Sequence, residues 1–583
     1  MTELTDGDPI TTEIIRSAFV AITDEMKVNL MRTAHNPVIY EALDYTVGLF
    51  DATGDTVSIG LGLPMFIGGL ADSIRAKLEF YGIENLHPDD ILLTNDPYIM
   101  GSHLNHLVFS QPIFSPEGEL VAFASTMAHW ADIGGTLAGT TTDIYSEGLQ
   151  LPICKIFKRG VQDPELTNII RANVRLPDNA MGDFFAQVAA VKTGERRVSA
   201  LLEKYGTGTV LAAMRQIMVN SEAQARRAVA GFPNGVYEAE SFMDDDGVTT
   251  GKPIPLKVKV IIEDDQMTID LSGISPQVAG YYNAGESAGR SCAQVAFKCL
   301  TSPKLLPINE GSFRALKIIL PPGKVVSAQK PAAVRWWMTI PMTIVDTVFR
   351  ALAPAIPDHT IAAHHADIVV PYMYGTDHRT GRFFIDPMFG VPGGGWGATS
   401  KHDGMSATIC INDGDTHNTP VEAGEVRVPY ITEYYRLRRD SGGPGKYRGG
   451  MGAELSRRMQ APGFFNSQIE RTVFPPWGIE GGGDAMPNKI KVRRADGTME
   501  EYPNGKLDSI QLTPEDAVII SAGGGGGFGD PTERDVDAVK LDVIRGYVSV
   551  EKARDAYGVV LDSTGREVDH AATESLRATR RAE

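Results

Sequence analysis

The sequence predicts a mixed α/β (α+β) protein built from several domains, and three observations lead to this prediction. The chain has 583 residues, which corresponds to about four domains of ordinary size. Its 61 glycines and 35 prolines exceed the usual share, which favours turns and irregular backbone over a bundle of long helices. Apolar residues recur at helical spacing in the first part of the chain and alternate with polar ones after about residue 231.

The first 230 residues are expected to form an α/β region. Apolar residues three and four positions apart predict a helix over residues 11–32, directly after Asp8-Pro9. Short apolar or β-branched runs bounded by Gly, Pro, Asp or Ser predict strands at 45–50, 91–94, 107–113 and 120–127. Helical stretches are expected between and after them, at 69–81, 164–204 and 210–229.

The rest of the chain is predicted to be rich in β-structure. Residues 231–330 show alternating runs that predict antiparallel strands, followed by a helix at 290–300 and a strand at 317–320. Residues 331–530 are glycine-rich and are expected to form a barrel or sandwich of short strands. Residues 531–583 are expected to form a helical tail, with an amphipathic hairpin at 535–557.

Charge and cysteine content exclude several classes of protein. With 55 Lys and Arg against 73 Asp and Glu, the formal charge of −18 repels nucleic acid and anionic membrane surfaces. No apolar run approaches the ~18 residues of a membrane span. Four cysteines with no CxxC pair are too few for a disulfide framework, and residues 1–8 show no targeting signal. A cytoplasmic protein with reduced thiols is expected.

Two glycine motifs match the letter patterns of a nucleotide site and a catalytic site but lack the structural context that such sites need. Residues 524–529 match GxGxxG, but the chain ends about 55 residues later, without room for a dinucleotide fold, so a structural loop is the better interpretation. Residues 285–289 match a nucleophile elbow but lack the strong preceding strand, so they are expected to begin an ordinary helix. No phosphate-binding loop of the GxxxxGK[ST] type is present.

Histidine and aspartate residues cluster at predicted strand ends in the first 135 residues. His103 and His106 precede one strand, and His129 and Asp132 follow another. Asp44 enters an apolar strand, where an unpaired charge is costly and needs a cation or a hydrogen-bond network. The spacing alone is compatible with a metal site, but scattered histidines are more often surface or core hydrogen-bonders. The other histidine candidates are interpreted as structural: His364, His365, His402 and His417.

Five sequence blocks, found in order along nearly the whole chain, resemble the hydantoinase B/oxoprolinase family. They are LTNDPYIMGSH at 93–103, HWADIGG at 129–135, EGLQLP at 147–152, DSGGPGKYRGG at 440–450 and GGGGGFGDPTERD at 523–535. The resemblance implies one subunit of an ATP-dependent enzyme that opens a cyclic amide such as a hydantoin, 5-oxoproline or a lactam. It also implies a hydantoinase A-type partner that binds ATP-Mg, in an α2β2 hetero-oligomer. The family includes subunits of acetone and acetophenone carboxylases.

The resemblance also implies the site residues. Its metal ligands match Asp44, His103 and His129, and this chain carries His106 where the family usually has aspartate. Three imidazoles and one carboxylate favour Zn²⁺ over Mn²⁺ or iron. Asp132 and Glu147 are expected either to orient a ligand or move a proton, or to stabilise the fold.

Three functions are compatible with this resemblance. Cyclic-amide opening is favoured because the length of 583 residues is like that of hydantoinase-type subunits. A ketone carboxylase subunit, which would use bicarbonate, is the first alternative. A scaffold with a structural metal is the second, and the absence of cysteine from the predicted ligand set counts against it.

Overall fold

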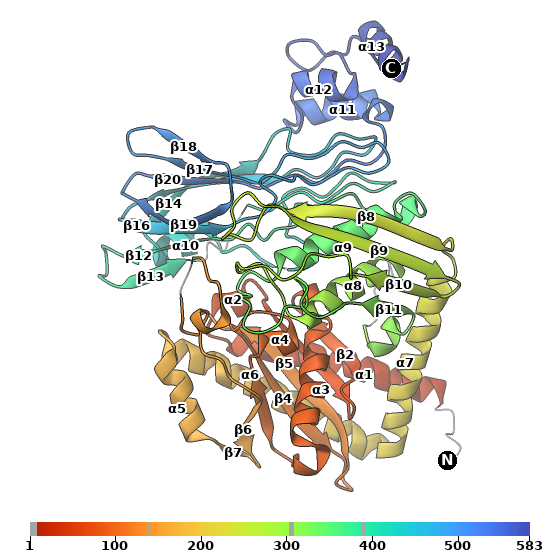
Figure 1. Ribbon diagram of the computed structural model, residues 1–583, viewed down its shortest axis with the longest axis vertical. Coiled ribbons are helices and arrows are strands. Elements are labelled where there is room, and N and C mark those ends of the chain that lie inside the picture. Colours follow the sequence, from red (N-terminus) through yellow and green to blue (C-terminus); the bar gives the residue numbers. More distant parts are fainter. Residues whose placement is uncertain (1–7, 137–138, 302–307, 387–391, 415, 583) are drawn as a thin grey trace.

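The computed structural model describes residues 8–582 except 137–138, 302–307, 387–391 and 415. The N-terminal region is a helix–sheet–helix layer built on a seven-stranded antiparallel sheet in the order β2-β1-β5-β4-β3-β6-β7 (Figure 1). Its strands are β1 (Tyr45–Asp51), β2 (Thr56–Leu61), β3 (Ile91–Thr94), β4 (His106–Phe114), β5 (Leu120–His129), β6 (Cys154–Lys158) and β7 (Val161–Gln162).

Both faces of this sheet are covered. Helices α1 (Pro9–Thr33) and α6 (Pro177–Tyr205) pack on one face, and α3 (Gly69–Tyr81) packs on the other. Because both faces are buried, the central strands β4 and β5 are buried along almost their whole length. The predicted first helix is confirmed, and Asp8 caps it by accepting from the backbone N–H of Thr11 at 2.9 Å.

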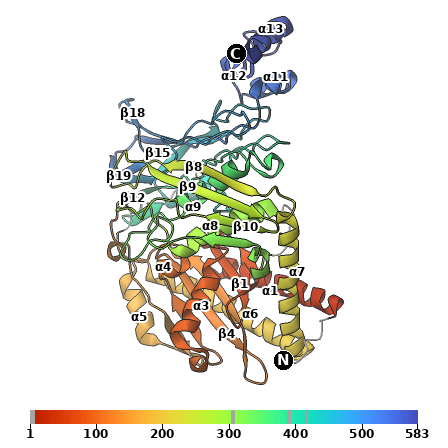
Figure 2. The ribbon, with the colours of Figure 1, turned by 45° about the vertical axis from the view of Figure 1, so that its right-hand side comes forward.

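The helical stretch expected at 164–204 consists of two helices. The structure divides it into α5 (Pro164–Asn173) and α6, because the residue before Pro177 is disfavoured in helical conformation. The next helix, α7 (Thr207–Val229), runs along the side of the molecule from the N-terminal layer to the middle sheet, as Figure 2 shows. This helix therefore connects the two layers.

The middle region contains a four-stranded sheet in the order β11-β10-β9-β8. Antiparallel pairing joins β8 (Gly235–Met243), β9 (Ile254–Glu263) and β10 (Gln266–Asp270), as predicted, and β11 (Leu316–Ile319) adds in parallel. Two helices lie beneath it, α8 (Glu286–Thr301) and α9 (Thr339–Leu352). Helix α9 was not predicted; every residue in it except Arg350 is buried.

Two antiparallel sheets form the C-terminal β-region. One has the order β13-β12-β16-β19, from Phe383–Asp386, Pro371–Thr376, Gly463–Gln468 and Lys506–Leu512. The other has the order β14-β15-β20-β17-β18, from Tyr430–Leu437, Ala453–Met459, Ala517–Ser521, Lys489–Arg493 and Met499–Tyr502. The prediction of several short strands between about residues 426 and 520 is confirmed.

Glycine-rich segments extend beyond these strands and hydrogen-bond to one another. The N–H of Gly525 donates to the carbonyl of Gly450 at 2.9 Å, and the N–H of Gly450 donates to that of Trp396 at 2.8 Å. A Cβ on Gly525 would lie 1.9 Å from the Trp396 oxygen, so only glycine fits there. The GxGxxG run at 524–529 is thus a packing element, in agreement with its interpretation as structural.

The C-terminal tail forms a small helical unit that projects from the β-region (Figure 1). Helices α11 (Val536–Ile544) and α12 (Val550–Tyr557) form the predicted hairpin, and α13 (His570–Ala582) lies in the segment 531–583 that was expected to be a helical tail. Arg534 fixes the unit through ion pairs with Asp403 at 2.7 Å and Asp542 at 2.8 Å. Among the described residues, no helix is both long and apolar enough to cross a membrane.

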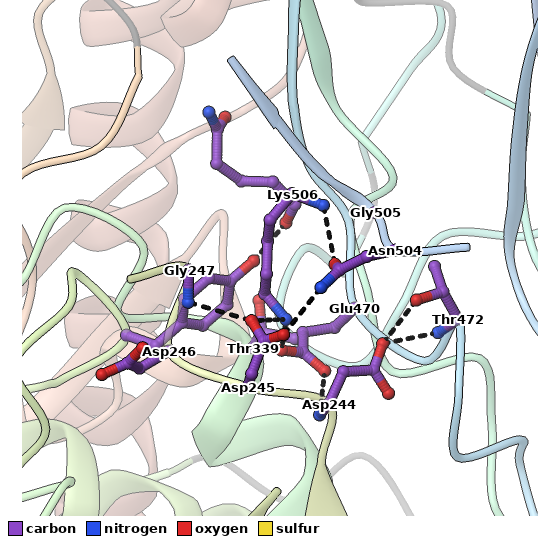
Figure 3. Close-up of polar contacts among 12 residues, drawn as sticks. Asp244, Asp245, Asp246, Gly247, Thr339, Glu470, Thr472, Asn504, Gly505 and Lys506 are labelled. Atoms are coloured by element: carbon purple, nitrogen blue, oxygen red, sulfur yellow. Dashed lines mark hydrogen bonds and ion pairs between the residues drawn. The ribbon is translucent and has the colours of Figure 1, made fainter. Parts of the chain in front are cut away.

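A buried polar cluster joins the middle sheet to the C-terminal β-region (Figure 3). The backbone N–H of Asp244, after β8, donates to the Glu470 carboxylate at 2.9 Å, and the Asp244 carboxylate accepts from Thr472. Lys506, on β19, forms ion pairs with Glu470 and, at 3.5 Å, with Asp245. These contacts connect segments more than two hundred residues apart, and so hold the two regions together.

Candidate metal centre and its pocket

Strand pairing brings three of the predicted metal ligands to the same end of the seven-stranded sheet. His106 begins β4, His129 ends β5, and the two residues are direct partners in the β4–β5 register. Asp44 immediately precedes β1, and its carbonyl accepts from the backbone N–H of His129 at 3.1 Å. His103 reaches the same place from the loop before β4.

The four side chains lie close together. The ring centroids are 4.7 Å apart for His103 and His106, 4.8 Å for His103 and His129, and 5.0 Å for His106 and His129. The Nε2 atom of His106 lies 2.9 Å from Oδ1 of Asp44. As these side chains are placed, no group of three or more His, Cys, Asp or Glu in the described part of the chain is already arranged to ligate an ion.

The hydrogen bonds of the cluster leave several imidazole nitrogens unused. Nδ1 of His103 lies 3.0 Å from the carbonyl of Arg335, so this nitrogen carries the proton and Nε2 keeps a free lone pair. The Nε2 of His103 and the Nδ1 atoms of His106 and His129 are buried without a hydrogen-bond partner in the described residues. Buried nitrogens are rarely left unpaired, so three together call for a ligand.

Burial favours the neutral form of two of these imidazoles, His103 and His129, beside the ionised carboxylate of Asp44. Burial lowers the pKa of His129 to about 4 and holds the pKa of His103 well below its ordinary value. Burial by itself would raise the pKa of Asp44, but the charge of His106 and its hydrogen bond outweigh this, and the pKa is lowered. Neutral imidazole and ionised carboxylate are the protonation states that bind metal.

The cluster opens into a cavity of about 250 Å³ between the N-terminal layer and the C-terminal β-region. Its walls come from residues around Asp44 and His129, from the segment at Arg335, and from two C-terminal segments that carry Tyr372 and Asp413. A small molecule of the size of a five- to seven-membered ring fits this volume.

Glu147 lies behind the cavity wall and not in it. Its carboxylate accepts from the backbone N–H groups of Val334 at 3.1 Å and Arg335 at 3.0 Å, and from the Thr141 hydroxyl at 2.7 Å. The Arg335 carbonyl in turn accepts from His103. Glu147 therefore holds the segment that orients a candidate metal ligand.

Asp132 lies at a neighbouring cavity of about 340 Å³, which shares Pro37, Ala131, Leu176 and Ile385 with the first. Both of its oxygens are occupied. One accepts from Nη1 of Arg175 at 2.6 Å and from the N–H of Gly134 at 3.1 Å, and the other from the backbone N–H of Arg175. Its predicted role in proton transfer stays a prediction.

The pocket residues that come from the C-terminal half were not predicted. Arg335, Tyr372 and Asp413 line the cavity but belong to no motif, and their distance along the chain from Asp44 hides the contact. His417, interpreted as structural, also lies in the wall. His364 is bonded to Asp346 at 2.8 Å, away from the lining of the cavity.

Comparison with known proteins decides the family. A profile described as hydantoinase B/oxoprolinase matches residues 8–531. The chain belongs to this family. It is 29% identical over 99% of both chains to a putative D-/L-hydantoinase subunit of Pseudomonas sp., and 31% identical to the caprolactamase beta subunit of Pseudomonas jessenii, over 98% of this chain and 99% of that one.

Solved structures agree with this assignment. The crystal structure of ATP-dependent caprolactamase from Pseudomonas jessenii matches with a TM-score of 0.91 and 28% identity, over 98% of this chain and 100% of that one. A nucleotide-free acetone carboxylase matches with a TM-score of 0.89, over 100% of this chain and 84% of that one. At 20% identity, this second likeness shows a shared fold. The predicted family and the mixed, multi-domain fold are confirmed.

Proposed function

We propose that this hydantoinase B/oxoprolinase-family chain is the metal-bearing subunit of a two-component, ATP-dependent enzyme that opens a cyclic amide. The observation that carries the proposal is the full-length similarity to the caprolactamase beta subunit, together with the clustering of four side chains. They are Asp44, His103, His106 and His129, and all of them except His106 line one cavity. The substrate class is a hydantoin, 5-oxoproline or a lactam.

The proposal includes a hydantoinase A-type partner that binds ATP-Mg, in an α2β2 assembly. Both of the Pseudomonas relatives are named as subunits, which supports a hetero-oligomer. In this chain the glycines of the motif at 524–529 pack closely against the backbone of other segments, which supports a structural role for the motif. Opening an unstrained amide has little driving force. ATP bound by the partner would therefore activate the substrate by phosphorylating its amide oxygen.

The chain's own residues would prepare the pocket for the reaction. Asp44, His103, His106 and His129 would hold a divalent ion, with Zn²⁺ favoured over Mn²⁺ or iron. Such an ion supplies Lewis-acid chemistry, polarising a carbonyl oxygen or activating water. The Arg335 carbonyl fixes the tautomer of His103, Glu147 fixes the Arg335 segment, and apolar walls that include Trp336 and Ile409 limit access of bulk water.

One experiment separates this function from a ketone carboxylase that consumes bicarbonate. The chain is mixed with its partner, ATP, a panel of cyclic amides and ketones, and ¹⁴C-bicarbonate. We expect an opened amino acid without label and no turnover of ketones. Stable label in a ketone-derived product would assign the carboxylase function instead.

A second comparison addresses the scaffold alternative. His129→Ala removes an imidazole whose Nδ1 has no partner among the described residues, so folding should be preserved. We expect amide opening to be lost in this variant while ATP binding by the partner persists. Full ATP-dependent turnover by the folded variant would show that the chemistry resides elsewhere.

A further inference from the structure

The cavity contains a second carboxyl group that the metal set does not use. Among the described residues that line it, Asp44 and Asp413 are the acidic ones. Asp413 comes from the segment before β14, far along the chain from the histidines, and its side chain belongs to a residue only 5% exposed. A buried carboxyl group in a pocket wall is costly unless it has a function or a partner.

The segment that carries Asp413 is fixed directly on the segment that carries Asp44. The Thr416 hydroxyl donates to the carbonyl of Ala42 at 2.7 Å and lies 2.9 Å from the carbonyl of Asp413. The backbone N–H of His417 donates to the carbonyl of Glu41 at 3.1 Å. Asp413 is therefore held in place against the N-terminal layer, as a reacting group must be.

Asp413 has weak partners for a buried acid. Nδ2 of Asn412 donates to Oδ1 at 2.6 Å, and the Cys410 thiol lies 3.5 Å from Oδ2. Among the described residues, no lysine, arginine or histidine nitrogen forms an ion pair with Asp413, and no hydrogen bond joins it to Asp44. One carboxyl oxygen is thus satisfied only by a weak sulfur contact, and remains able to bind a substrate atom.

The surroundings of Asp413 raise the pKa of its carboxyl group. Burial, and next the negative charge of Asp44, raise the pKa of Asp413 to about 7, while Asn412 and Cys410 oppose the shift and Asp367 adds to it. Across the cavity it faces the neutral imidazoles of His103 and His129, the Arg335 guanidinium and the Tyr372 phenol. A group that titrates near neutral pH is well matched to proton transfer.

The other candidate acids are occupied. The Glu147 carboxylate accepts from two backbone N–H groups and a hydroxyl, and that of Asp132 accepts from Arg175 and Gly134. Neither lines the cavity with the histidines. Asp413 alone among these three acids is both in the cavity and weakly bonded.

We propose that Asp413 is the proton-transfer residue of the pocket, an inference that rests on the proposed amide-opening function. In the step, the oxygen of water bonds to the carbonyl carbon, the bond from that carbon to the ring nitrogen breaks, and the nitrogen leaves with the proton of the Asp413 carboxyl group. The proton released by the attacking water returns to the Asp413 carboxylate. Because the partner's ATP has phosphorylated the amide oxygen beforehand, the carbonyl carbon leaves this step as an acyl phosphate. A second water hydrolyses this acyl phosphate to carboxylate and inorganic phosphate, so atoms and charge balance.

The test compares the wild type with Asp413→Asn, which keeps the shape and the Asn412 contact, in the complex with the partner and ATP. We expect kcat to fall about 10²- to 10⁴-fold, KM to change by less than about threefold, and metal content to be unchanged. The limb of the pH–kcat profile near neutral pH should disappear. Glu422→Gln, an exposed acid of the same region, is the matched control and should behave as wild type.

A second variant distinguishes chemistry from folding. Asp413→Ala should be inactive and partly rescued by added formate, which supplies a small carboxylic acid to the vacated space. Wild-type kcat in Asp413→Asn, loss of metal in that variant, or absence of formate rescue would each overturn the role of Asp413. Failure of the wild type to open any cyclic amide would instead overturn the proposed function itself, and with it this step.

Discussion

At the scale of single residues, the position of a candidate metal ligand depends on a residue that does not contact it. Glu147 touches neither the histidines nor the cavity, yet it binds the backbone of Val334 and Arg335, and Arg335 binds His103. Such outer contacts orient metal ligands and raise their basicity. The candidate ligands and their support thus form one connected unit.

We predict that Glu147→Gln weakens metal binding about 10- to 100-fold, because an N–H₂ donor replaces Oε2, which accepts from the backbone N–H of Val334 at 3.2 Å, and because the charge that strengthens the remaining hydrogen bonds is lost. Competition with a chelator measures the metal affinity directly, without need of turnover. Glu165→Gln, an exposed acid, serves as the control. An unchanged metal affinity would show that Glu147 supports only the fold.

The buried Lys77 on α3 should make the free energy of unfolding depend on pH. Its Nζ donates to the Ser110 hydroxyl at 2.9 Å and the Val108 carbonyl at 3.2 Å, and no carboxylate pairs with it among the described residues. Burial lowers the pKa of Lys77 to about 7 from an ordinary value of 10.5. Between these pH values the unfolded chain binds a proton that the folded chain lacks, so the free energy of unfolding rises with pH.

Lys77→Met should remove this rise and stabilise the protein at pH 7 by a few kcal/mol, since the cost of burying the amine is lost. Urea unfolding at pH 7 and pH 10 measures both effects. Lys158→Met, at an exposed lysine, is the control. A steeper pH dependence in Lys77→Met than in wild type would contradict the account.

At the scale of elements, the sequence predicted those helices and strands that have one buried and one exposed face. The amphipathic α1 and the alternating strands β8 and β9 expose one side, so their periodicity is visible in the sequence. Helix α9 is buried nearly all round, and a short, largely apolar run of this kind is also typical of a buried strand. The proximity of Asp44, His103, His106 and His129 was predictable because these residues lie in family blocks or at strand ends. Asp413 was not, since only tertiary folding brings it to the cavity.

The glycine-rich segments give a prediction at the same scale. Gly525→Ala would place a Cβ 1.9 Å from the Trp396 carbonyl, with backbone on both sides unable to yield. We expect it to destabilise the protein by more than about 3 kcal/mol or to prevent folding.

Gly208→Ala is the matched control, because a Cβ there meets no atom within 4 Å and lies in α7. This change should be neutral or stabilise by about 0.5–1 kcal/mol. Thermal unfolding compares the two variants, and equal melting temperatures would show that the glycine segments are not closely packed.

At the scale of the whole molecule, the pocket depends on regions distant in sequence being held together. The N-terminal layer supplies the histidines, the segment at Arg335 supplies the back wall, and the C-terminal region closes the cavity. The buried cluster around Lys506 joins the middle sheet to this C-terminal region (Figure 3). Residues that never touch the pocket therefore determine whether it closes.

Lys506→Met should destabilise the protein by about 3–5 kcal/mol, because it leaves the Glu470 and Asp245 carboxylates buried without their cation. Urea unfolding measures this loss. Lys491→Met, which removes a half-exposed ion pair with Glu501, should cost under about 1 kcal/mol. Equal losses in the two variants would show that the buried cluster does not hold the regions together.

The metal content of the chain purified with its partner, compared among wild type, Asp44→Ala and His106→Ala, tests the proposed metal site. We expect about one divalent ion per chain in wild type and a large loss in both variants, because each of the two residues would supply a ligand to the same ion. His106→Ala is the sharper variant, since this histidine replaces the usual aspartate of the family. Wild-type protein that contains no metal, or variants that retain it fully, would contradict the account.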